Sequence, residues 1–173
     1  TLTNSDLANI KIAKEMGVTG VMQPFVRDHS DLECVKEALR EAGAEDIRLF
    51  AKIENMDGVR KLEKLLPAAD EIVIARGDLG NAVHLWDLPG VQRQIAEKCR
   101  AAGKPFMVVT QMLASMERSP VPTRAEVNDI FHAVMDGAAS IMVTGETAVG
   151  DYPVEVIRYM VNTVRSAEKE ENR

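Results

Sequence analysis

The sequence is most informative at Glu71-Ile72-Val73-Ile74-Ala75-Arg76-Gly77-Asp78-Leu79-Gly80. Its first half is short and apolar, with β-branched residues, and this pattern predicts a strand over residues 71–75. A strand without polar alternation is typical of a parallel sheet covered on both faces. The second half brings an arginine, an aspartate and two glycines directly to the end of that strand. We therefore read the stretch as a buried strand followed by a polar turn.

The same unit repeats along the chain, as helices alternate with short apolar strands. The pattern predicts strands at 18–25, 47–53, 71–75, 106–109 and 141–143. It predicts helix starts at the capping boxes Thr3–Asp6, Ser30–Glu33 and Thr123–Glu126, and helix stops at Gly17, Gly43, Gly103 and Gly137. It also predicts one helix through Val59, Leu62 and Leu66, a longer one from Leu88 to Cys99, and a last one with Pro153 in its first turn.

Two closures suit such a chain: an open doubly wound sheet, or part of a (β/α)₈ barrel. Five strands taken alone favour a flavodoxin-like sheet. A complete barrel needs about 250 residues, and this chain has 173.

The composition is that of an ordinary globular protein, with 46% hydrophobic and 28% charged residues. The net charge of −6 is spread along the chain, which argues against a nucleic-acid partner. No apolar run approaches the roughly 20 residues of a membrane span, and no signal peptide begins at Thr1. Cys34 and Cys99 fall in predicted helices, without metal-ligand spacing, and we expect both to be buried, reduced thiols of a cytoplasmic protein.

Polar residues gather where the predicted strands end, the edge at which parallel sheets build their sites. Lys52 and Glu54 end the second strand, and side chains two apart share a face. The same spacing leads us to expect Arg76 and Asp78 on one face of the third strand. Glu54 and Asp78 could then converge on Mg²⁺, a cation that takes oxygen ligands and keeps several waters. Lys52 would place a positive charge beside it.

A structural explanation of these charges stays open. Lys52 could pair with Glu54 or Asp78, and Arg76 with Glu54, without any ligand. Thr110 and Thr144 could be strand-end hydroxyls or helix caps. Against this, burying several charges at strand ends is costly unless each is satisfied. No Walker or GxGxxG pattern occurs, which weakens a P-loop or dinucleotide site.

Six motifs in register resemble the pyruvate kinase family, over about residues 2–167. They are Lys52-Ile53-Glu54-Asn55, Ala75-Arg76-Gly77-Asp78-Leu79-Gly80, Gly103-Lys104-Pro105, Thr110-Gln111-Met112-Leu113, Pro122-Thr123-Arg124-Ala125-Glu126 and Gly145-Glu146-Thr147-Ala148. The resemblance implies an incomplete TIM barrel, with residues 1–173 forming strands four to eight of the catalytic domain. It also implies that the lid domain and the C-terminal effector domain are absent from this chain.

By the same resemblance, the reaction is glycolytic transfer of a phosphoryl group from phosphoenolpyruvate to ADP, giving pyruvate and ATP. Lys52 and Thr110 look like the catalytic residues, and Glu54 and Asp78 like ligands of Mg²⁺ or Mn²⁺. Lys52, Gly77, Asp78 and Thr110 resemble the substrate-binding positions. K⁺ is usual in the family, but its ligands and a phosphate-binding arginine belong to strands that this chain lacks.

Two segments depart from the family pattern. Asn81–Trp86 replaces the usual acidic residue and proline, and Met22–Phe25 replaces small residues before the phenylalanine. We expect His84 and Trp86 to serve loop packing or an interface, and the chain to form a homo-oligomer or to be completed by the missing strands. The alternatives are another metal-dependent, enolate-handling barrel enzyme and a non-catalytic half-barrel module.

Overall fold

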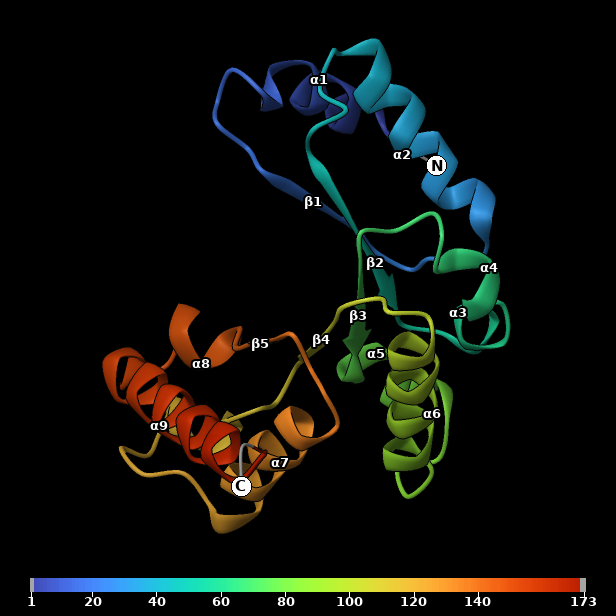
Figure 1. Ribbon diagram of the computed structural model, residues 1–173. Helices are drawn as coiled ribbons and strands as arrows, with labels where there is room; N and C mark the ends of the chain where they lie inside the picture. The colour runs from blue at the N-terminus through green and yellow to red at the C-terminus, as the bar shows by residue number, and fades with distance from the viewer. Residues whose placement is uncertain (1, 172–173) are drawn as a thin grey trace.

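The computed structural model describes residues 2–171, so Thr1 and the last two residues lie outside this account. One parallel sheet holds five strands in chain order: β1 (Gly20–Gln23), β2 (Arg48–Ile53), β3 (Glu71–Ala75), β4 (Phe106–Val109) and β5 (Ser140–Met142) (Figure 1). Because the order never reverses, the sheet has no switch point of the doubly wound kind. The flavodoxin-like alternative is therefore wrong, and the fold is an incomplete (β/α) barrel.

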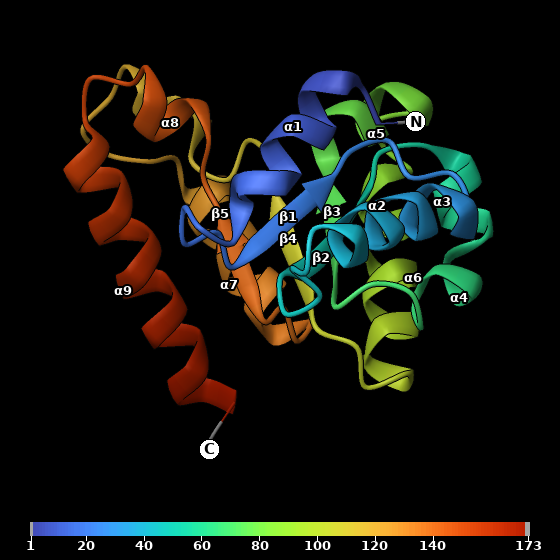
Figure 2. The ribbon, with the colours of Figure 1, turned by 90° about the horizontal axis from the view of Figure 1, so that it is seen from above.

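Helices connect the strands and cover the sheet on its outer side (Figure 1, Figure 2). They are α1 (Asn4–Ala13), α2 (His29–Glu41), α3 (Met56–Arg60), α4 (Leu62–Leu65), α5 (Arg76–Ala82), α6 (Leu88–Ala101), α7 (Arg124–Met135), α8 (Gly145–Ala148) and α9 (Pro153–Glu171), with a 3₁₀ turn at Ala114–Glu117. Both views place α1 and α2 towards the β1 edge and α9 at the β5 edge. None of the helices within residues 2–171 combines the length and hydropathy of a membrane span.

The predicted helix boundaries hold with two exceptions. Thr3 and Thr123 form complete capping boxes, and the four predicted stop glycines all have positive φ. The box at Ser30 is wrong: Asp28 is the N-cap, and its carboxylate accepts a hydrogen bond from the Ser30 backbone N–H. Asp caps as well as Ser does, so the helix begins earlier. The helix predicted through Val59 and Leu66 breaks at Lys61 into α3 and α4.

The first strand is shorter than predicted, ending at Gln23 instead of Phe25. Pro24 has no N–H for the ladder, and Phe25 has a φ of 51°, so neither continues a strand.

The core has two parts, because strand side chains alternate between faces. Ile72 and Ile74 of β3 belong to the large cluster beneath the helices. Val73 and Ala75 point to the other face, where they pack with Val109 of β4. All five residues of β3 are buried, as expected of a strand covered on both sides.

A polar contact shows that the sheet curls. Glu71 of β3 is buried, and its carboxylate accepts hydrogen bonds from Ser140 Oγ of β5 at 2.7 Å and from Arg48 Nη2 of β2 at 2.9 Å. Strands lie about 4.8 Å apart, so reaching across β4 to Ser140 brings the inner faces of β3 and β5 together. We conclude that the inner face is concave, like the wall of a barrel.

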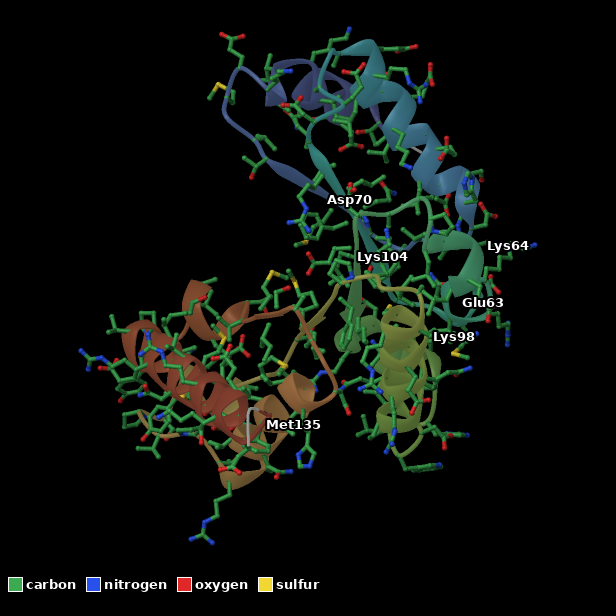
Figure 3. The ribbon with its side chains drawn as sticks, in the orientation of Figure 1. Glu63, Lys64, Asp70, Lys98, Lys104 and Met135 are labelled. Carbon is green, nitrogen blue, oxygen red and sulfur yellow. The ribbon has the colours of Figure 1, made fainter. Side chains whose placement is uncertain are left out.

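Several charged side chains away from the predicted site make structural contacts. Glu63 of α4 and Lys98 of α6 form a 2.9 Å ion pair and lie side by side in Figure 3. Asp70 accepts the Leu49 N–H at 2.7 Å, and Lys104 donates to the Ala69 carbonyl. Asp70 and Lys104 thus brace the end of the sheet opposite the predicted site, whereas the Glu63–Lys98 pair joins two helices.

We predict that Ile74→Ala lowers the free energy of unfolding by about 2–5 kcal/mol, because it leaves a cavity in the core. Ile74 is fully buried, whereas Ile12, in α1, is 49% exposed and gives a matched control. Ile12→Ala should change stability by less than about 0.5 kcal/mol. Urea unfolding followed by circular dichroism measures both, and equal losses would contradict the assigned core.

Candidate functional site

Lys52 and Glu54 meet at the carboxyl end of β2. Lys52 Nζ lies 2.8 Å from Glu54 Oε1, and the Phe25 backbone N–H donates to Glu54 Oε2 at 2.7 Å. Glu54 is only 4% exposed, so both of its oxygens are satisfied by the protein. The expected shared face of the two side chains is confirmed, and so is the ion pair that the sequence left open.

Asp78 does not lie on a strand. β3 ends at Ala75, and Arg76 opens the helix α5. The expectation that Arg76 and Asp78 share a strand face is therefore wrong. Leu79 supplies the reason, because its buried side chain anchors α5 to the core and turns the chain away from the sheet. Asp78 lies in the first turn of α5, where its side chain is exposed.

Gly77 and Thr110 are brought together although they come from different βα units. A Cβ placed on Gly77 would lie 3.0 Å from Thr110 Cγ2 and 3.7 Å from Thr110 Oγ1. A side chain at position 77 would therefore press on Thr110. β3 and β4 run in register, with Ala75 beside Val109, so the residues after both strand ends are neighbours.

The chain after β4 is conformationally strained. Thr110 has a φ of 84° and Gln111 a φ of 55°, values that residues with a side chain rarely adopt. Such conformations cost on the order of 1–3 kcal/mol each and persist where the surroundings impose them. Val109 and Met112 are buried on either side, which forces the turn to occur within two residues.

Arg76 joins this strained turn to α7. Its Nε and Nη2 donate to the Thr110 carbonyl at 3.2 and 2.8 Å, and its Nη1 donates to both carboxylate oxygens of Asp129 at 2.8 and 2.7 Å. The suggested pairing of Arg76 with Glu54 is wrong. No sequence motif identifies Asp129 as a site residue. The one local signal is indirect: Glu126 of the capping box lies three residues earlier, on the same face of α7.

Two further carboxylates hold the segment after Thr110. Glu126 accepts hydrogen bonds from Ser115 N and Oγ at 2.7 and 2.6 Å. Burial by itself would raise the pKa of Glu126, but hydrogen bonds from Ser115 and Thr123 outweigh it and keep that pKa below its usual value. Glu146, 2% exposed, accepts the N–H groups of Leu113 and Thr144. The sequence had suggested Glu126 only as a cap.

The two residues predicted as metal ligands have different surroundings: Glu54 is buried and paired with Lys52, whereas Asp78 is exposed on α5. Carboxylate oxygens are the ligands that Mg²⁺ and Mn²⁺ accept, so the donor types fit. Within residues 2–171 no group of three or more His, Cys, Asp or Glu side chains gathers to hold a metal. A cation here would therefore take its other ligands from water or substrate oxygens.

The cysteines and the unusual loop lie outside this arrangement. Cys99 is buried, and burial raises the pKa of its thiol to about 12 against the opposing charge of Lys104. Cys34 is exposed, so the expectation that both are buried is wrong. His84 and Trp86 stack with ring centroids 4.6 Å apart, and Trp86 is 78% exposed.

Comparison with known proteins gives one consistent match. The family model "Pyruvate kinase, barrel domain" matches residues 1–157. The chain is 42% identical over 168 residues to pyruvate kinase of Bacillus licheniformis, covering 97% of this chain and 29% of that protein. It is 42% identical over 167 residues to pyruvate kinase of Dictyostelium discoideum, covering 96% of this chain and 33% of that protein. It is 39% identical over 171 residues to pyruvate kinase of Clostridium acetobutylicum, covering 99% of this chain and 36% of that protein. The chain thus spans about a third of the length of these relatives.

We predict that Gln111→Gly leaves stability unchanged or raises it by up to about 1 kcal/mol, because glycine adopts positive φ without steric cost. Gln94 is the matched control, an exposed glutamine inside α6. Gln94→Gly should cost about 1 kcal/mol, as glycine does within a helix. Thermal unfolding compares the two variants. A loss at position 111 as large as that at 94 would show that the turn is not strained.

Proposed function

The chain belongs to the pyruvate kinase family, and on that premise we propose that it carries the lysine and metal side of a site that moves the phosphoryl group of phosphoenolpyruvate to ADP. The observation that carries the proposal is the Lys52–Glu54 contact at the end of β2. It lies one strand away from the helix that carries Gly77 and Asp78. Neighbouring ends of parallel strands are where barrel enzymes assemble their sites.

Lys52 supplies positive charge to the transferred group. An ammonium has three N–H donors, and Glu54 occupies one of them. The Lys52 side chain is 26% exposed, so it can reach a ligand while remaining anchored. Charge held in place before the reaction stabilises developing negative charge without reorganisation.

Glu54 and Asp78 would hold Mg²⁺ or Mn²⁺. When bound, the cation neutralises charge on the substrate oxygens and orients them for transfer. Glu54 is preorganised by Lys52 and by the Phe25 N–H, whereas Asp78 is exposed on α5 and can turn towards a ligand. K⁺, expected from the resemblance, would be held by residues outside this chain.

Gly77 and Thr110 would contact the enolate portion of the substrate. In the reaction, the bond from phosphorus to the enolate oxygen breaks, and a new one forms to the terminal phosphate oxygen of ADP. The enolate then takes a proton at C3 to give pyruvate, and we assign Thr110 to the place where this proton arrives. Such catalysis consists of positioning and electrostatic stabilisation.

We assign residues 1–173 to the C-terminal portion of the barrel domain, acting in the cytoplasm as part of a larger enzyme. β1 and β5 each have one unpaired edge in the sheet of the described residues. Open strand edges favour association with further strands. The chain is therefore expected to form homo-oligomers or to be completed by the first three βα units.

We predict that Mn²⁺ binds this chain no more tightly than roughly millimolar, near −4 kcal/mol, because two protein ligands act without the substrate phosphate. The double variant Glu54→Gln, Asp78→Asn should abolish the binding. Glu15→Gln with Asp87→Asn, both exposed acids elsewhere, makes the same charge change and should leave it intact. Water proton relaxation measures the affinity. Equal binding by both double variants would sink the metal assignment.

We predict that the chain alone self-associates and has no measurable activity, whereas adding a polypeptide that supplies the first three βα units of a family member restores activity. In the restored enzyme Lys52→Met should lower the rate on the order of 10²–10³-fold, ~2.7–4 kcal/mol, the usual loss for one such donor. Light scattering measures association, and a coupled assay measures pyruvate formation.

Lys11→Met is the control, because Lys11 is exposed on α1. It should leave the restored rate unchanged. A monomer of this chain that turns over phosphoenolpyruvate and ADP, or a restored enzyme indifferent to Lys52→Met, would overturn the assigned roles.

A further inference from the structure

Thr110 is held in its strained conformation by a chain of contacts that begins on α7. We propose that Arg76 and Asp129 are positioning residues: they keep Thr110 at positive φ and thereby keep its side chain against Gly77. The inference rests on the proposed function only in taking Thr110 as the residue that serves the substrate. The conformation itself can be tested without any substrate.

The first step is that Thr110 needs an external constraint. A β-branched residue at a φ of 84° is a rare outlier, so local preference works against it. The buried neighbours Val109 and Met112 require a tight turn, but they do not specify where the Thr110 peptide faces. The orientation of that peptide is set by two hydrogen bonds, from Arg76 Nε and Nη2 to the Thr110 carbonyl.

The second step is that Arg76 needs Asp129. The Arg76 side chain is 12% exposed, and a guanidinium at that depth is costly without a counter-charge. Asp129 meets Nη1 with both carboxylate oxygens, which leaves Nε and Nη2 directed at the carbonyl. The planar fork of arginine can serve both partners at once. Lysine, with a single ammonium at the end of a flexible chain, cannot reproduce this geometry.

The third step connects the turn to the site. Thr110 Cγ2 and Oγ1 are the atoms that a Cβ on Gly77 would meet. Because φ sets where Cβ stands relative to the preceding peptide, a return of Thr110 to negative φ would move its methyl and hydroxyl groups away from Gly77. The Arg76–Asp129 pair therefore controls the site through Thr110 rather than through contact with substrate.

The pair is also reachable from solvent. Arg76 and Asp129 lie on the wall of a cavity of about 260 Å³ that Leu88, Pro89, Gln92 and Gln111 also line. Removing the arginine side chain would enlarge this cavity next to an unpaired Asp129. A small planar cation could then enter and take the place of the guanidinium.

The test is NMR of the 173-residue chain. In the unchanged chain we expect a strong amide–Hα nuclear Overhauser effect within Thr110, the sign of positive φ, and a cross-peak between the Thr110 methyl and Gly77 Hα. Arg76→Lys, Arg76→Ala and Asp129→Ala should each lose both signals while the other amide resonances stay dispersed. Asp151→Ala, which breaks the exposed Arg118–Asp151 pair, is the matched control and should keep both.

Chemical rescue separates positioning from a general loss of packing. Methylguanidinium added to Arg76→Ala should restore both signals, whereas methylammonium at the same concentration should not. If Arg76→Ala or Asp129→Ala fails to fold, the same two Thr110 signals are measured in Arg76→Lys, which keeps the positive charge, and their loss or persistence there decides the proposal. Signals that persist in the folded variants would overturn the proposal, as would equal rescue by both cations. A failure of Mn²⁺ binding would count against the proposed function and leave this result standing.

Discussion

The parallel pairing of β3 with both β2 and β4 is the constraint on which the site depends. Register places Lys52 beside Val73 and Ala75 beside Val109, so the chain leaves the three strands at nearly the same level. Glu54, Arg76 and Thr110 are each the first or second residue beyond those paired positions. The ends of three βα units therefore lie along one edge of the sheet, and there Arg76 contacts the Thr110 carbonyl directly. Burial on both faces keeps β3 in this register, because a slip by one residue would exchange its two sets of side chains.

Carboxylates do different work at the two ends of the sheet. Glu71 at the amino end joins side chains of β2 and β5 on the concave face. Glu54 and Glu146 at the carboxyl end accept backbone N–H groups from loops. All three are buried, where an unpaired charge would cost several kcal/mol. Across the described residues no buried side-chain nitrogen or oxygen lacks a hydrogen-bond partner. Each of these three carboxylates therefore helps to hold strands or loops in place in addition to carrying its charge.

The local pattern was enough to predict most of the secondary structure. Thr3 and Thr123 reveal helix starts because a capping box is a contact between residues three apart. The stop glycines are equally local, since positive φ is a property of one residue. Errors arose where two local solutions compete. Asp28 and Ser30 can both cap a helix, and Arg76–Gly80 could extend a strand or begin α5. Buried Leu79 decided the second case, and burial is not a local property.

Lys52 and Glu54 could be paired from the sequence, because residues two apart on a strand share a face and their separation is determined by strand geometry. The family could also be identified, since its motifs follow one another in register along the chain. The contact between Arg76 and Asp129 spans 53 residues, and that between Glu71 and Ser140 spans 69. No period or cap relates such positions. Only the folded sheet decides them, because the curvature of the strands and the packing of α7 set which distant side chains come within hydrogen-bonding distance.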